Sequence, residues 1–214
     1  MKKYIDRNKK EIVTIILVIV GLTVFGYIFA GYVYFAPTED EIMIPLAYNE
    51  NKIASQFPTN SQYKIKNEFI PKLSIPSLNI NTRIQYVGIN SKGNMSAPSN
   101  FVDVGLYKYG PLPGEVGSAV IAGHVVNGLG IKSIFGNLKN IEIGDAVYVE
   151  MEQGKRIKFV VSSMSIYDFD AEAGEVFNQN DGAYLKLITC SGKWSRENRT
   201  HDKRLVVTAI KSDS

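Results

Sequence analysis

The chain begins with a long apolar segment. Residues 12–35 contain no charged side chain and consist mainly of Ile, Leu, Val, Phe, Tyr, Gly and Ala. A helix of this length can span a bilayer with some tilt. A cleavable signal peptide is the alternative, but its apolar part has about 7–15 residues and precedes an Ala-x-Ala-like site, which is not evident here. The pattern therefore predicts an uncleaved transmembrane signal-anchor helix.

Short apolar runs, separated by polar or Gly-containing stretches, make up residues 64–214. Most alternate apolar and polar positions, which is the pattern of half-buried strands. The strands that we predict are residues 70–76, 78–84, 118–123, 146–151, 156–161, 184–189 and 205–210. Residues 146–151 and 156–161 flank a Gly-containing turn and predict a hairpin. Its core face would consist of Val147, Val149, Met151, Ile157, Phe159 and Val161.

The stretches between these runs predict loops and one short helix. The predicted loops are residues 90–100, 104–117, 165–181 and 193–203. Ile131, Ile134, Phe135 and Leu138 follow the i, i+3, i+4, i+7 spacing of one helical face. We expect this helix to pack on the sheet.

Composition divides the chain into four parts. Residues 1–11 hold five Lys or Arg and two Asp or Glu, so they carry the whole formal charge of +3. A basic flank predicts a cytoplasmic leader and places the remainder outside the cell. Residues 36–63 are polar and interrupted by proline, which predicts a stem with a short helix near residues 42–48. Residues 64–214 then form one domain. The chain after residue 11 holds 19 basic and 19 acidic residues, and this balance gives no basic face for nucleic acid.

The only cysteine, Cys190, follows the apolar run 184–189 and precedes Ser191-Gly192. A thiol at the end of a buried strand is held rigidly and can still meet a ligand, as a nucleophile requires. The alternative is a core cysteine, since Cys is among the most buried residue types. One cysteine excludes an internal disulfide and argues against a Cys-rich zinc site.

Two other strand ends carry groups that complement a thiol. His124 follows the run 118–123, and Arg204 opens the run 205–210. If these strands pair, Cys190, His124 and Arg204 meet at one rim of the sheet. A cation lowers the pKa of a thiol, an imidazole exchanges protons near neutral pH, and a guanidinium can hold an oxyanion. These groups make a coherent acyl-transfer site.

At these residues the chain resembles the sortases, the cysteine transpeptidases of Gram-positive cell surfaces. The family's marks stand here as Leu187–Cys190, Ala122–His124 and Arg204. The segments most similar to class F are Gly105–Tyr107, Gly110–Gly114, Gly117–Val125 and Leu187–Gly192. The resemblance covers about residues 70–211. The Asp-Pro-aromatic lid motif expected of a pilus-polymerising sortase does not occur upstream.

The resemblance implies a mostly β fold, a closed β-barrel of about eight strands with one or two short helices, preceded here by the transmembrane helix. It also implies an enzyme that cleaves an LPxTG-like sorting signal through a thioester on Cys190. The acyl group would pass to a cell-wall precursor amine or another amine nucleophile. His124 would be the general acid and base, Arg204 the oxyanion and substrate clamp, and Thr189 part of the same pocket. The partners would be surface proteins that bear sorting signals, and the enzyme would sit in the cell membrane as a single-pass protein.

Several alternatives stay open. The chain could be a hydrolase-dominant surface cysteine protease, or a non-enzymatic surface β-barrel binding module in which Cys190 is structural. His201 competes with His124, and Arg196 and Arg199 compete with Arg204. The motif favours His124, and the start of a strand favours Arg204.

No cofactor is expected. Acidic residues in the loop 165–181 could bind calcium, which some sortases use; they are Asp168, Asp170, Glu172, Glu175 and Asp181. Residues 104–117 hold no dense acidic cluster to complete such a site, so a solvated loop is favoured.

Overall fold

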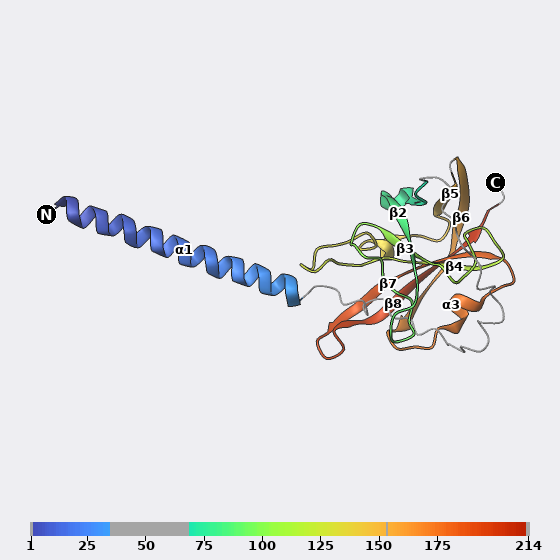
Figure 1. Cartoon of the computed structure of the whole chain (residues 1–214). Helices are drawn as coiled ribbons and strands as arrows, with labels where there is room; N and C mark the ends of the chain where they lie inside the picture. The colour runs from blue at the N-terminus through green and yellow to red at the C-terminus, as the bar shows by residue number, and fades with distance from the viewer. Residues whose placement is uncertain (1, 35–68, 153, 213–214) are drawn as a thin grey trace. The chain divides into compact units, whose positions relative to one another are not determined.

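The computed structural model describes residues 2–34, 69–152 and 154–212, which include two units (Figure 1). The N-terminal unit contains one helix, α1 (Lys2–Tyr34), so the predicted N-terminal helix is confirmed. Within it, Glu11–Phe29 has a mean hydropathy of 2.7 and no buried residue. By length and composition this stretch can cross a membrane. The predicted stem, with its helix near residues 42–48, lies outside the described residues.

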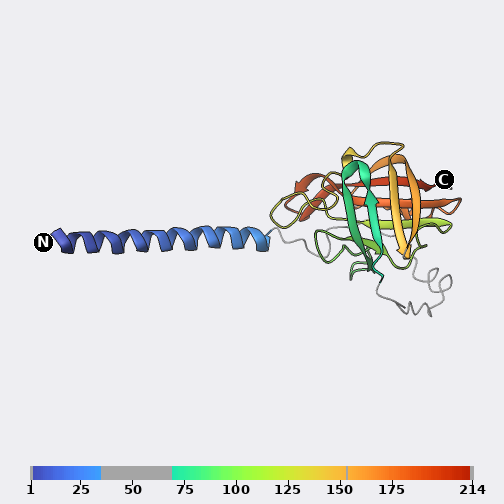
Figure 2. The same cartoon turned by 90° about the horizontal axis from the view of Figure 1, so that it is seen from above.

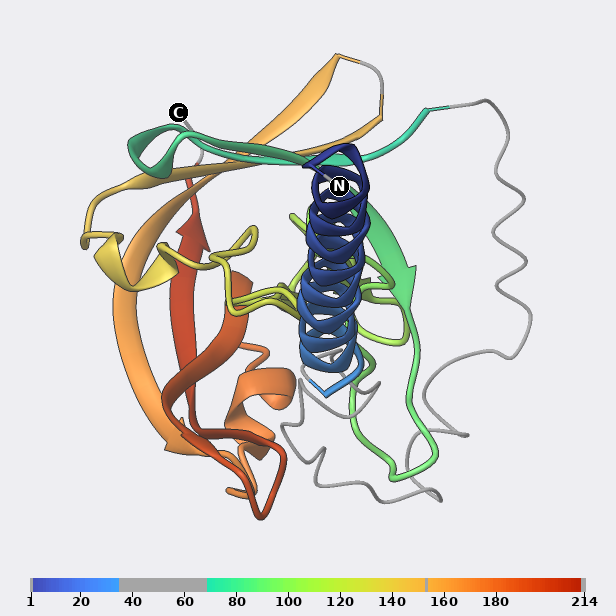
Figure 3. The same ribbon diagram turned by 90° about the vertical axis from the view of Figure 1, so that its left-hand side faces the viewer.

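The second unit is a closed β-barrel of eight strands within the described part of the chain (Figures 2 and 3). Around the barrel the order is β1-β2-β3-β4-β7-β8-β6-β5, which confirms the predicted fold class. The strands are β1 (Lys72–Ile75), β2 (Ile80–Val87), β3 (Val104–Tyr107), β4 (Gly117–Ala122), β5 (Ala146–Glu152), β6 (Lys155–Asp168), β7 (Ala183–Ser195) and β8 (Thr200–Lys211). A 3₁₀ turn, η1 (Pro76–Leu78), joins β1 to β2. The pairs β2–β3 and β4–β7 are parallel, and the other neighbours are antiparallel.

Alternate side chains of the strands fill the barrel. The predicted hairpin of β5 and β6 is confirmed, with Val149 opposite Ile157 and Val147 opposite Phe159. Val147, Val149 and Phe159 are wholly buried in one apolar core, against which Met151 and Ile157 pack. Burial of this kind contributes roughly 1.5–3 kcal/mol for each large apolar side chain, so the alternating pattern that predicts the strands also stabilises the barrel.

The prediction of a helix at residues 131–138 is wrong. This segment forms turns, and a 3₁₀ helix, η2 (Leu138–Asn140), follows. The backbone N–H of Phe135 donates to the carbonyl of His124, and that of Ser133 donates to the carbonyl of Val125. These donors therefore bond to the preceding segment instead of to helical i−4 carbonyls. Phe135 and Leu138 are buried as predicted, whereas Ile131 is exposed.

Three predicted loops also prove to be partly regular. Val104–Tyr107 is strand β3, because it pairs with β2 and β4. In 165–181, β6 continues to Asp168 by pairing with β8, and a short helix, α3 (Gly174–Asn178), follows. In 193–203, β7 and β8 extend past the barrel core to a turn at residues 196–199. Cys190 and Arg204 therefore lie within their strands and not at strand ends.

We expect Gly123→Ala to destabilise the barrel. A Cβ at Gly123, the residue after β4, would overlap the ring of Phe135. Overpacking of this kind lowers the free energy of unfolding by about 1–3 kcal/mol. The measurement is urea unfolding of the full chain in detergent micelles, followed by the fluorescence of Trp194, the only tryptophan. Phe135→Leu in the same chain should recover part of the loss, and an unchanged midpoint in the single variant would contradict the packing argument.

Candidate active site

Cys190 and Arg204 are direct cross-strand partners. They stand opposite each other in the β7–β8 ladder, one pair beyond Thr189 and Leu205. Residues directly opposite on one sheet face have Cβ atoms about 4.5–5.5 Å apart. Alternation along β7 sends Leu187 into the barrel core and Cys190 to the outer face of the sheet. There Cys190 belongs to a second apolar cluster and is 2% exposed.

The backbone of His124 continues the parallel pairing of β4 with β7. The last register pair is Ala122 with Ile188, and His124 and Cys190 each lie two residues further on. Two hydrogen bonds extend the ladder beyond β4: Gly123 N–H donates to the Ile188 carbonyl at 3.0 Å, and Thr189 Oγ1 donates to the Gly123 carbonyl at 2.8 Å. The sequence-predicted residues thus come from three neighbouring strands.

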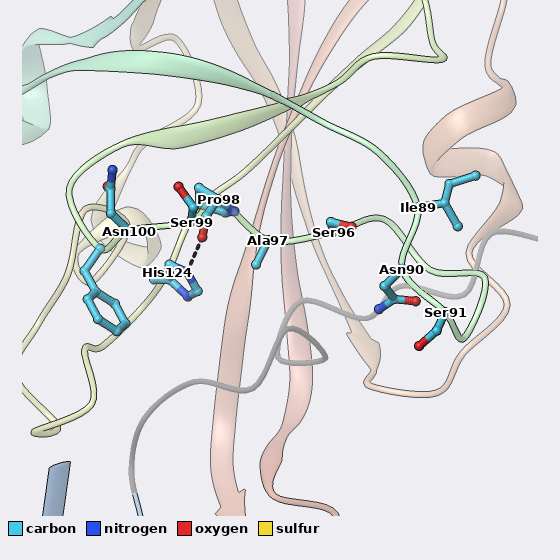
Figure 4. Close-up of a pocket in the computed structure, with 10 residues that line it drawn as sticks. Ile89, Asn90, Ser91, Ser96, Ala97, Pro98, Ser99, Asn100 and His124 are labelled. Atoms are coloured by element: carbon cyan, nitrogen blue, oxygen red, sulfur yellow. Dashed lines mark hydrogen bonds between the residues drawn. The ribbon is translucent and has the colours of Figure 1, made fainter. Parts of the chain in front are cut away.

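The ring of His124 is held by the loop between β2 and β3. Its Nε2 is 3.0 Å from the Pro98 carbonyl oxygen, and its ring centroid is 5.1 Å from that of Phe101 (Figure 4). Because a carbonyl only accepts, Nε2 donates this hydrogen bond and Nδ1 keeps the lone pair in the neutral ring. His124 is 4% exposed, and this burial lowers its pKa from the usual 6.5, partly opposed by the bond to Pro98. The neutral imidazole is therefore the main form at pH 7.

Arg204 is wholly buried, with its guanidinium directed to its own strand. Nη1 donates to the carbonyls of His201 at 2.7 Å and Lys203 at 2.8 Å, and Nη2 donates to Thr200 Oγ1 at 2.9 Å. Thr200 is itself buried. These neutral acceptors orient the cation without cancelling its charge, so a positive group lies on the strand that pairs with Cys190.

Two cavities adjoin these side chains. The larger, of about 460 Å³, borders His124 and is otherwise lined by residues 89–91 and 96–101 (Figure 4). The smaller, of about 160 Å³, borders Thr189, Cys190, Lys139 and His201. His124 and Cys190 therefore border different cavities, although their backbones occupy equivalent positions beyond the last register pair of β4 and β7.

His201 lies closer to the thiol than its predicted place in a loop suggested. It belongs to β8, pairs with Trp194, and borders the same cavity as Cys190. Its Nδ1 is 3.4 Å from the Gly192 carbonyl, and its ring meets that of Trp194 edge-on. Burial lowers the pKa of His201, the bond to Gly192 opposes this, and the Arg204 cation lowers it further.

Sequence reasoning missed the groups that orient the predicted residues. The Pro98 carbonyl carries no side-chain signal, and Thr200 stood in a predicted loop. Tyr107, in a predicted loop, is buried in the cluster that contains Cys190.

Three of the five acidic residues considered for calcium have other partners. Asp168 pairs with Lys203, Glu175 hydrogen-bonds Tyr167, and Asp181 hydrogen-bonds Tyr184. Across residues 11–29, 69–152 and 154–212, no three side chains of the His, Cys, Asp and Glu types gather as a metal-binding group. We assign no residue to a metal or cofactor.

We expect the pKa of His124 to lie below 6.5 in the folded protein, because burial disfavours the imidazolium. The unfolded chain then binds a proton more readily, so this residue's contribution to stability is present above pH 6.5 and is lost as the pH falls. The measurement is an NMR titration of the histidine Cε1–H signals of the full chain in micelles. His201→Gln assigns the signals, and a midpoint at or above 6.5 for His124 would contradict the expectation.

Comparisons with known proteins agree with this fold. The family model described as the Sortase domain matches residues 73–212. Similar solved structures include a lid mutant of sortase A from Corynebacterium diphtheriae, with a TM-score of 0.53 and 23% identity over 68% of this chain and 70% of that one. Sortase C1 of Streptococcus agalactiae gives a TM-score of 0.52 and 24% identity over 67% of each chain. These two likenesses concern the fold. No curated protein matches the chain. Since the matched domain covers more than half of its length, the chain belongs to the sortase family of cysteine transpeptidases.

Proposed function

We propose that this enzyme is a membrane-anchored transpeptidase that cleaves an LPxTG-like sorting signal through a thioester on Cys190 and transfers the acyl group to a cell-wall amine. The observation that carries the proposal is the alignment of three neighbouring strands. Cys190 pairs with Arg204 on β8. Cys190 and His124 each lie two residues beyond the last register pair of β7 and β4. A nucleophile, a base and a cation on one rigid sheet are what acyl transfer requires.

In the first half-reaction, the neutral imidazole of His124 takes the proton of the Cys190 thiol. The thiolate sulfur attacks the carbonyl carbon of the signal's Thr, and Arg204 stabilises the oxyanion that forms. The imidazolium then donates its proton to the nitrogen of the following Gly. The C–N bond breaks, the Gly-bearing fragment leaves as an amine, and the acyl group remains on sulfur.

In the second half-reaction, the acceptor amine attacks the thioester carbon and gives a proton to His124. The C–S bond breaks, an amide forms, and the thiol and the neutral imidazole are restored. Thr189 supports both steps indirectly, because its bond to the Gly123 carbonyl fixes the peptide that leads into His124. Transfer prevails over hydrolysis when the amine reaches the thioester before water does.

Anchoring follows from α1 and its basic leader. We propose residues 1–11 as cytoplasmic, 12–35 as the membrane span, 36–63 as an extracytoplasmic stem and 64–214 as the catalytic domain. Exposed Ile, Leu, Val and Phe side chains along Glu11–Phe29 support the span. We also propose that the enzyme belongs to class F, on the basis of the sequence segments that resemble that class. This assignment does not identify the amine acceptor.

Substitutions should separate the proposed roles. Cys190→Ala should give no covalent adduct by mass spectrometry when the full chain in micelles meets a Leu-Pro-x-Thr-Gly peptide. His124→Ala should lower kcat/KM about 10²–10⁴-fold, as loss of general acid–base catalysis does. His201→Ala should keep most activity. If the two histidine variants show the reverse, His201 is the base.

Arg204→Lys should lower kcat about 10²–10³-fold, because an ammonium lacks the planar fork that can hold both the oxyanion and the neighbouring acceptors. Arg199→Lys, in the turn at residues 196–199, is the matched control and should change kcat less than twofold. Steady-state peptide cleavage measures both. Equal rates for Arg204→Lys and the parent would remove Arg204 from the reaction.

The partition between transfer and hydrolysis tests the transpeptidase proposal. Added amines should accelerate turnover of the peptide and convert the product from a free acid to an amide, as mass spectrometry can show. Activity that no amine changes would favour the hydrolase-dominant protease. A Cys190→Ala variant with every phenotype of the parent would favour the binding module.

A further inference from the structure

A buried lysine lies on the same strand as the proposed nucleophile. Lys186 is 6% exposed, and it is the one buried lysine among the described residues. It stands four residues before Cys190 on β7, so both side chains emerge from the outer face of the sheet. Its neighbours in the ladders are Val120 on β4 and Thr208 on β8. The proposed reaction gives this ammonium no role.

Lys186 joins the sheet to the segment between β6 and β7. Its Nζ donates to Gln179 Oε1 at 2.8 Å and to Thr208 Oγ1 at 3.1 Å. Gln179 is the residue after α3, and its own carbonyl accepts from Ser118 Oγ at 3.2 Å. The side chain and the backbone of Gln179 are therefore both bound to the sheet, the first to β7 and the second to β4.

This segment, residues 169–182, covers the outer face beside Cys190. Ala173 and Val176 are buried in the same apolar cluster as Cys190 and Ile188. Phe177 also meets the ring of Tyr107 edge-on, with centroids 5.6 Å apart. The position of α3 therefore determines how closely this cluster packs around Cys190.

At the other end of α3, Tyr167 on β6 hydrogen-bonds Glu175. The pKa of Tyr167 is raised first by burial and then by Glu175. The helix has five residues and is too short to be stable by itself. It depends on attachments at both ends, and the attachment at Gln179 uses a buried charge.

A methionine would fill the site of Lys186 without burying an ammonium. Buried charges destabilise unless they are hydrogen-bonded, and apolar replacements are often neutral or stabilising. The lysine gives instead a charge-assisted hydrogen bond with a defined length and direction. Such a bond restricts the segment to one position, which apolar packing alone does less strictly.

We infer that Lys186 is a positioning residue that holds residues 169–182 over the sheet through Gln179 and so shapes the sorting-signal site next to Cys190. The inference rests on the proposed function. It gives Lys186 no contact with the reacting atoms. Loss of the link should therefore weaken substrate binding more than the chemical step.

The test compares Lys186→Met and Gln179→Leu in the full chain in micelles. In both variants the amides of residues 174–182 should exchange with deuterium about tenfold faster, and KM for the peptide should rise about tenfold with kcat within threefold, as for a lost hydrogen bond to a charged group. Iodoacetamide should alkylate Cys190 faster as well. The double variant should match either single variant, because both remove one link.

Two matched variants separate the link from general stability. Gln179→Glu keeps an acceptor for Lys186 and should preserve the exchange rates and KM of the parent. Thr208→Val removes the partner of Lys186 on β8 but leaves the bond to Gln179, so KM should change less than twofold.

Unchanged exchange and alkylation in both Lys186→Met and Gln179→Leu would overturn the inference, as would faster exchange without a change in KM. The exchange and alkylation rates need no peptide. They therefore decide the link even if the enzyme cleaves no LPxTG-like signal, which would refute the proposed function alone.

Discussion

The parallel hydrogen bonding of β4 with β7 is the constraint on which the proposed site depends. From Gly117 with Ala183 to Ala122 with Ile188, partners keep one register without a bulge. His124 and Cys190 continue it two residues later. A slip of one residue would turn every side chain of a strand to the opposite face. The sulfur and the imidazole can therefore cooperate only if this ladder is intact. The hydrogen bond from Thr189 Oγ1 to the Gly123 carbonyl stabilises the end of the ladder next to His124.

Arg204, the third residue of the proposed site, is positioned by the antiparallel pairing of β7 with β8. β7 and β8 form a long antiparallel ribbon that extends past the barrel core, and Arg204 stands opposite Cys190 in that ribbon. Its Nη1 and Nη2 donate to the neutral oxygens of Thr200, His201 and Lys203, which orient the guanidinium on the strand that pairs with Cys190. The buried imidazole is neutral at pH 7. Transfer of a proton from thiol to imidazole then creates an ion pair without changing the net charge of the site.

Alternation of apolar and polar residues predicted those barrel strands that have one buried face. Val147, Val149 and Phe159 alternate with more exposed residues, and this periodicity is sufficient to identify β5 and β6. It failed in the ribbon beyond Cys190, because polar residues such as Lys193 and Asp202 occupy strand positions there with no core beneath them. Helical spacing at residues 131–138 also failed, since backbone donors bond to His124 and Val125 instead.

Chemistry-bearing residues were easier to find in the sequence than their supports. Cys190, His124 and Arg204 were singled out by residue type and by motif. The Pro98 carbonyl that holds His124 belongs to the backbone, and any residue could supply it. Lys186 offered no signal at all, because a lysine in an alternating strand is ordinarily exposed and its burial depends on where α3 lies.

Distance decides how Lys186 acts on the site. Four residues along a strand span about 13 Å, whereas cross-strand partners lie about 5 Å apart. Because the Coulomb energy falls at least in proportion to distance, a charge at the strand position of Lys186 acts on Cys190 less strongly than one at the position of Arg204. Burial lowers the pKa of Lys186, while Glu175 and Asp181 raise it and weaken its field at the sulfur. Lys186 therefore acts on the site through its hydrogen bond to Gln179, and its charge serves to fix the position of α3.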